Sequence, residues 1–283
     1  LPRRRGARFG ARRAGLGDER DDGGGQRVHV ARTHQGPAAP VVEDIGDGAD
    51  VPDVPITTTL LEGAPAAVLA AHLAGGAAEL VVMATHRRGE MRRFLLGSVA
   101  DELVRRATVP VLLVASGEDQ GEDPGEGRAA REVADLSRVL VPLDGSSSGA
   151  AIIAHAVSVA GSAGVRYRLA RVLDPVSATV GPHLGVSVAR TDIPRAHEEA
   201  ERFLQPLVEA MRARGLDVET RVVVAPEPVG AILELAREFD AGLIAMETHG
   251  YPRAGRLLLG SVAGRVLSRT DVPVLVHRRA VDP

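Results

Sequence analysis

The sequence predicts a doubly wound α/β fold that occurs twice in the chain, once complete and once incomplete. Two observations support this prediction: an internal repeat that relates the two halves, and an alternation of short apolar strands with amphipathic helices in the second half. The length of 283 residues suits two domains of about 140 residues each.

The internal repeat is the stronger observation. When the sequence is shifted by 163 residues, residues 56–114 align without a gap with residues 219–277, and 19 of the 59 aligned positions are identical. Fifteen of these identities fall within residues 83–112. Such a concentration of identities indicates that a domain has been duplicated.

Residues 137–283 are predicted to form the complete domain. Short apolar or alternating runs predict strands, and apolar residues at helical spacing predict helices. Strands are expected at 139–144, 167–173, 218–225, 243–246 and 272–276, and helices at 146–160, 192–214, 229–239 and 261–269. Five β-α units of this kind predict a parallel sheet with helices on both faces.

Residues 26–115 are predicted to form a partial copy of the same domain. A strand at 28–32, a strand at 80–83 and the final helix and strand have counterparts in the second half. The strand at 140–144 has none, and the spacing between the second and third strands is 24 residues shorter than in the second half. The first copy is therefore expected to lack its central strand and its long helix.

Two segments lie outside the repeat. Residues 1–25 are rich in Arg, Gly and Asp and show no periodicity, which fits either a disordered tail or translation from a misplaced start. Residues 116–136 are acidic and rich in Gly, which is typical of a solvated linker between domains.

Composition argues against several functions. Aromatic residues make up 2% of the chain and the net charge is −3, so neither base stacking nor a broad basic surface for nucleic acid is expected. The absence of cysteine excludes thiolate chemistry and fits a reducing, cytoplasmic location. No apolar run is long enough to suggest a membrane span.

The candidate site lies where ligands bind in doubly wound sheets, beyond the carboxyl ends of the central strands. Asp144, Gly145 and Ser146 follow the first strand of the second copy, and the segment from Glu247 to Ser261 follows the fourth. Gly260 and Ser261 open a helix, where free N–H groups and the helix dipole favour an anion.

These segments resemble the universal stress protein family. The resemblance rests on Val-Pro-Leu-Asp-Gly-Ser at 141–146, on Thr-His-Gly at 248–250 followed by Gly-Ser-Val-Ala at 260–263, and on the ending Val-Pro-Val-Leu-Val at 272–276. It implies flavodoxin-like, Rossmann-like sheets of the adenine nucleotide alpha hydrolase type, each with five parallel strands in the order 3-2-1-4-5. The first of the two sheets would be incomplete. Some members of the family bind ATP and others do not.

The resemblance also implies a set of ligand-binding residues. Asp144 would face the adenine or ribose, and the backbone of Val172 would line the adenine pocket. ATP-binding members carry Gly-x-x-Gly, nine residues, then Gly-Ser or Gly-Thr. On this sequence, Gly250 matches the second glycine of the pattern, and Gly260 and Ser261 match its Gly-Ser. These three residues and Val262, which follows them, complete the implied cofactor-binding set.

The first glycine of the pattern is replaced in both copies. In the second copy Glu247 stands there, and a carboxylate beside phosphates repels them unless a cation or Arg253 compensates. In the first copy Ala84 and Arg87 replace both leading glycines, so that copy is expected to bind nucleotide weakly or not at all.

Structural roles are the alternatives for these residues. Asp144 could be a turn residue before Ser146, and Ser261 could be a plain helix N-cap. His86 and His249 occupy equivalent positions in the two copies, but neither has a second ligand at metal-binding spacing, so a loop-shaping role is favoured and no metal site is predicted.

The leading functional interpretation is a stress-response protein that binds ATP, with or without Mg²⁺, and acts through a protein partner rather than by catalysis. The alternative is a nucleotide-free interaction scaffold of the same fold. An enzyme is not expected, because neither a Gly-x-Ser-x-Gly elbow nor a P-loop occurs. The two copies end in apolar edge strands, 109–114 and 272–276, and exposed edges of this kind tend to be paired or covered. The family resemblance implies that these two strands pair with each other and join the copies as an intrachain pseudo-dimer.

Overall fold

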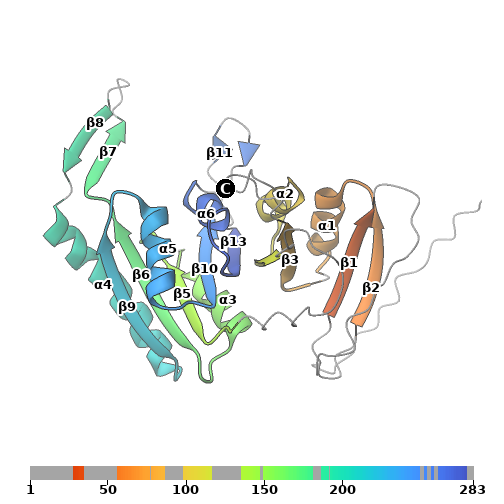
Figure 1. Cartoon of the computed structure of the whole chain (residues 1–283), viewed down its shortest axis with the longest axis horizontal. Helices are drawn as coiled ribbons and strands as arrows, with labels where there is room; N and C mark the ends of the chain where they lie inside the picture. Colours follow the sequence, from red (N-terminus) through yellow and green to blue (C-terminus); the bar gives the residue numbers. More distant parts are fainter. Residues whose placement is uncertain are drawn as a thin grey trace, which may run out of the picture.

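The structure is a computed structural model of the chain (Figure 1). It describes residues 28–34, 56–76, 78–86, 98–116, 135–146, 149–180, 186–190, 192–248, 252–253, 256–257 and 261–278. The predicted tail at 1–25 and most of the predicted linker at 116–136 lie outside these residues.

The second copy has the predicted architecture. Its strands join in the order β13-β10-β5-β6-β9, and all four pairings are parallel. Counted along the copy, this is the order 5-4-1-2-3, which confirms the prediction. The strands are β5 (Arg138–Pro142), β6 (Arg166–Leu173), β9 (Asp217–Val224), β10 (Leu243–Thr248) and β13 (Val274–Arg278). The helices are α3 (Ala151–Ala160), α4 (Ile193–Ala213), α5 (Pro228–Glu238) and α6 (Ser261–Leu267).

Local chemistry explains where these helices begin. Asp192 caps α4 by accepting a hydrogen bond from the Arg195 N–H at 3.4 Å, and Glu227 caps α5 by accepting one from the Gly230 N–H. The helix predicted from residue 146 begins only at Ala151. Residues 144–146 form a turn at the carboxyl end of β5.

Two small additions were not predicted. β7 (Val176–Val180) and β8 (Val186–Arg190) form an antiparallel hairpin between β6 and α4, and β11 (Pro252–Arg253) pairs with β12 (Arg256–Leu257) between β10 and α6. Neither pair belongs to the main sheet. Figure 1 shows the hairpin projecting away from the end of β6.

Among the described residues, the first copy has no strand that corresponds to β5, and its four strands form two separate pairs. β1 (Val28–His34) and β2 (Ile56–Glu62) form a parallel pair of their own, and β3 (Val81–His86) and β4 (Val111–Ser116) form a second parallel pair within the main sheet. In the second copy β5 lies between the corresponding strands β6 and β10. The predicted loss of the central strand therefore explains the division. The helices of this copy are α1 (Pro65–Ala74) and α2 (Ser98–Arg106).

The two copies meet through their last strands. β4 pairs antiparallel with β13, with Val111, Leu112 and Leu113 opposite Val276, Leu275 and Val274. This confirms the predicted pairing of the edge strands. The prediction of two separate sheets is wrong in one respect. β3 and β4 continue the five strands of the second copy, so a single seven-stranded sheet runs through both copies.

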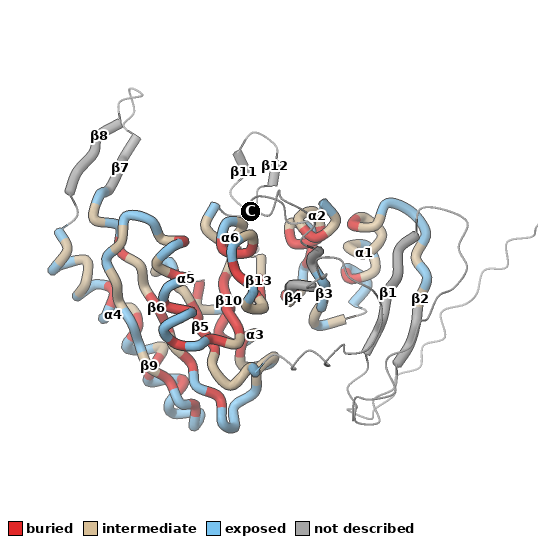
Figure 2. Tube along the Cα trace, in the orientation of Figure 1, coloured by how far each residue is buried: buried red, intermediate tan, exposed pale blue. Residues whose placement is uncertain are grey.

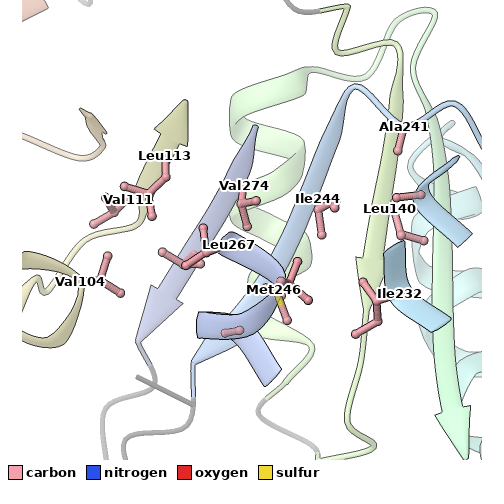
Figure 3. Close-up of a cluster of buried hydrophobic side chains, with 14 of the residues drawn as sticks. Val104, Val111, Leu113, Leu140, Ile232, Ala241, Ile244, Met246, Leu267 and Val274 are labelled. Carbon is pink, nitrogen blue, oxygen red and sulfur yellow. The ribbon is translucent and has the colours of Figure 1, made fainter. Parts of the chain in front are cut away.

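The sheet separates two apolar cores. One core lies under α3 and α4 and includes Ile152, Leu204 and Leu275. The other lies under α1, α2, α5 and α6 and draws on both copies. Figure 2 shows the buried residues concentrated along the sheet and the helix faces against it. Figure 3 shows Val104, Val111 and Leu113 of the first copy beside Val274 and Leu267 of the second.

Candidate functional site

The turn after β5 is organised by Asp144. Its Oδ1 accepts hydrogen bonds from the Ser146 backbone N–H at 2.8 Å and from the Ser146 hydroxyl at 2.7 Å. Ser146 Oγ in turn accepts from the Gly149 N–H at 3.1 Å. Asp144 is exposed at the carboxyl end of the strand. Its role as a turn residue is therefore present in the structure, and the turn holds the carboxylate at the carboxyl edge of the sheet.

Arg171 supports this turn from below, and the sequence analysis did not identify it. Its Nη1 donates to the Leu143 carbonyl oxygen at 2.9 Å. Gly145 has a φ of +88°, and a Cβ there would lie 2.7 Å from Arg171 Nη2. Burial lowers the pKa of Arg171, and the charge of Asp144 partly offsets this effect. Only glycine satisfies both the backbone conformation and the close approach of the guanidinium.

Val172, on β6, and Val262, on α6, face the same apolar core. Both side chains pack, partly buried, against the core under α5 and α6. Val172 is paired with Val223 of β9, so its backbone forms part of the carboxyl end of β6. The structure thus places Asp144, in the turn after β5, and Val172, near the end of β6, at the same edge of the sheet, because β5 and β6 are parallel neighbours.

Ser261 begins α6 and is exposed. Its carbonyl oxygen accepts a hydrogen bond from Arg265 Nε at 2.9 Å, and Arg265 Nη1 lies 3.3 Å from Oε1 of Glu227, the N-cap of α5. This ion pair joins the beginnings of α5 and α6. The other two predicted site residues, Gly250 and Gly260, lie outside the described residues.

The side chain of Glu247 does not have the surroundings that the sequence pattern predicts, beside the phosphates of a nucleotide. Its side chain is 4% exposed, and its Oε1 lies 3.9 Å from His277 Nδ1 on the neighbouring strand β13. Alternation along β10 places Glu247 on the same face as Leu243 and Ala245, which lie in the core under α3 and α4. The described neighbour of Glu247 is therefore a histidine, a side chain that is positively charged only when it is protonated. The side chain of Arg253, considered as the compensating charge, lies outside the described residues.

A second histidine completes this environment. The rings of His155, on α3, and His277 lie 4.4 Å apart between centroids and are tilted by 42°. Burial and the charge of His277 lower the pKa of His155, while Glu247 acts in the opposite direction. The repeated histidines singled out in the sequence, His86 and His249, have no described side chains. The sequence feature that could have indicated the His155–His277 contact is the position of His155 among the apolar residues of the predicted helix at 146–160.

Among the described residues, no group of three or more His, Asp or Glu side chains is arranged to hold a metal ion. The helices of the described ranges include none with the length and apolarity needed to cross a membrane.

The fold and the carboxyl-edge site define a tandem α/β protein of the doubly wound type, and comparison with known proteins identifies its family. The model of the universal stress protein family matches residues 13–115 and 136–278. The chain therefore belongs to the universal stress protein family, with two such domains. The first match begins within residues 1–25, upstream of the predicted domain boundary at 26.

Individual relatives agree with this assignment. A universal stress protein of Mycobacterium tuberculosis strain H37Rv is 32% identical over 204 residues, which cover 72% of this chain and 63% of that protein. One from Methanocaldococcus jannaschii is 30% identical over 143 residues, covering 50% of this chain and 82% of the relative. The chain thus spans less than two thirds of the length of the mycobacterial relative.

A solved structure shows the same fold. The crystal structure of a universal stress protein from Archaeoglobus fulgidus superimposes with a TM-score of 0.58, covering 80% of this chain and 72% of that chain at 21% sequence identity. At this identity the likeness concerns the fold, and it covers the tandem arrangement as well as a single domain.

Proposed function

We propose that the second copy binds an adenine nucleotide, with ATP as the leading candidate, at the carboxyl edge of β5, β6 and β10. The observation that supports this most directly is the ordered Asp144–Gly145 turn beside Val172, at the point where the strand order reverses between β5 and β10. Doubly wound sheets bind ligands at this point. Asp144 would contact the ribose or adenine, and Val172 would line the adenine pocket.

The phosphates would lie along the segment from Gly250 to Ser261, with Val262 behind it. In this arrangement Glu247 would not oppose the phosphates directly, because its carboxylate is buried on the α3 face beside His277. That environment favours binding despite the replacement of the first glycine of the pattern. Whether Mg²⁺ accompanies the nucleotide is an outcome of the test below.

The protein would act in the stress response by binding rather than by catalysis. Nucleotide occupancy would alter the surface offered to a protein partner, within the cytoplasm. This proposal rests on the absence from the sequence of the nucleophile and P-loop motifs of nucleotide-hydrolysing enzymes. The first copy, which lacks the central strand and both leading glycines, would contribute structure rather than a second nucleotide site.

Titration calorimetry on the full chain tests this proposal, with ATP, with and without Mg²⁺, and with GTP for comparison. We expect saturable binding of ATP, at least about tenfold weaker binding after Asp144→Ala, and no product formation on long incubation. The control is Asp174→Ala. Like Asp144, Asp174 accepts a hydrogen bond from the backbone N–H two residues later, that of Val176, at 2.9 Å, but Asp174 follows β6 rather than β5. Absence of ATP binding would favour the nucleotide-free scaffold, and release of ADP would identify an enzyme.

A further inference from the structure

A buried polar cluster lies between α3 and the sheet, on the face away from α5 and α6. It consists of His155 from α3, Glu247 from β10 and His277 from β13. Glu247 and His277 are direct partners in the parallel pairing of their strands, and His277 follows Val276, which is opposite Val111 of the first copy. The cluster therefore adjoins the strand that joins the two copies.

The cluster is not satisfied by hydrogen bonds. Glu247 Oε2 and His277 Nδ1 are buried and have no hydrogen-bond partner, and the exposed fractions of the two side chains are 4% and 18%. A buried carboxylate is costly unless a charge or a donor faces it. Imidazole side chains bind a proton between neutral and mildly acidic pH, so this cluster can take up a proton.

Among the described residues of the packed elements, the other charged groups have partners away from the cluster. On β13, Arg278 Nη1 donates to the Arg105 carbonyl oxygen. At the amino end of β5, Arg138 is paired with Asp240, and Asp144 lies beyond the carboxyl end of that strand, in its own turn. His155 is the only titratable residue of α3. The two imidazoles therefore share a single carboxylate.

We propose that this cluster is a proton-sensitive contact that holds α3 on β10 and β13 at neutral pH and weakens on mild acidification. One positive charge can be balanced by Glu247, but a second imidazolium would face the first at ring-contact distance without a carboxylate of its own. The helix would be released from the sheet at the strand that joins the copies. This inference does not depend on nucleotide binding.

The direction of the pH effect follows from His155. Burial first, and then the charge of His277, lower the pKa of His155 below its ordinary value. As the pH falls through about 6.5, the unfolded chain binds a proton at this residue while the folded chain does not. The equilibrium constant for folding should consequently fall by up to about tenfold per pH unit, until the pH reaches the lowered pKa of His155.

Urea unfolding of the full chain at pH values from about 7.5 down to about 5.5 tests the proposal. The wild-type midpoint should fall with pH, and His155→Gln should flatten this dependence. His197→Gln is the matched control, because His197 lies on the exposed face of α4 beside Glu201 at 3.5 Å and should leave the dependence as in the wild type. An unchanged dependence in His155→Gln would overturn the proposal.

Two further measurements keep the test decisive if the variant is poorly folded. Glu247→Gln should steepen the loss at low pH, because the carboxylate that balances the positive charge is removed. The ring C–H resonance of His155, assigned by its disappearance in His155→Gln, should titrate with a midpoint below about 6.5. A midpoint at or above the ordinary value, or a shallower loss in Glu247→Gln, would count against a proton-sensitive contact.

Discussion

Val274 lies directly opposite Leu113 in the antiparallel pairing that joins the last strands of the two copies. Val274 is 1% exposed and Leu113 is 3% exposed, and both belong to the core that α2, α5 and α6 cover. The junction is thus a continuous part of one hydrophobic core rather than a contact between two finished domains.

Val274→Lys should destabilise the protein strongly. An unpaired ammonium in this core would be buried without a partner, and such changes cost about 3–5 kcal/mol. We expect a lower urea midpoint and aggregation in size-exclusion chromatography. The control is Val224→Lys, because Val224 is 45% exposed at the end of β9 and should tolerate the charge. Equal behaviour of the two variants would contradict the role assigned to the junction.

The first copy should not fold on its own. A fragment of residues 1–115 would lack a central strand between its two strand pairs, and it would also lose the second copy's side of the shared core. Backbone groups left unpaired cost about 1–3 kcal/mol each when buried. We expect a broad, non-cooperative melt for this fragment in circular dichroism and a cooperative one for residues 136–283. A sharp two-state melt of 1–115 would refute the prediction.

Gly145→Ala should disturb the turn that carries Asp144. The new Cβ would meet Arg171 Nη2 at 2.7 Å, in addition to the strain of a φ of +88°. Gly164→Ala is the matched control, because its φ of +71° imposes similar strain while nothing lies within 4 Å of the added Cβ. The control should lose about 1 kcal/mol. Gly145→Ala should lose more than the control and bind ATP more weakly; equal losses would show that Arg171 yields freely.

Tyr167 should make the protein sensitive to alkali. Its side chain lies in the core under α3 and α4, its hydroxyl donates to the Gly161 carbonyl oxygen, and burial raises its pKa to about 12. The folded state therefore retains a proton that the unfolded chain loses near pH 10, so stability is present below that pH and falls between about 10 and 12.

The chain contains two tyrosines, and tyrosinate absorbance should accordingly rise in two steps, the later one with unfolding. Tyr167→Phe should remove the later step and lessen the alkaline loss of stability. The same variant should cost about 1 kcal/mol at neutral pH, because the hydrogen bond to Gly161 is lost. A single titration step at the ordinary tyrosine value in the wild type would contradict this.

The strand order of the second copy was implied by the family resemblance. The sequence by itself determined the repeat, the strands of the second copy and the lack of a counterpart to its central strand in the first. These features are local or repeated: an apolar run such as Val139–Val141 predicts a buried strand wherever it occurs, and a gap in an aligned repeat is visible without coordinates. The pairing of the edge strands was predicted because both are apolar and end their copies, and because the family resemblance implies that they pair with each other.

Only the tertiary structure decided which residues surround the site and the junction. Arg171 lies beneath Gly145 because β5 and β6 are neighbours in space, and Glu247 lies beside His277 and near His155 through contacts between segments far apart in the chain. Periodicity gives the face of a strand but not what covers that face. The sequence therefore presented Glu247 as a charge near phosphates, and packing placed its carboxylate against a pair of histidines.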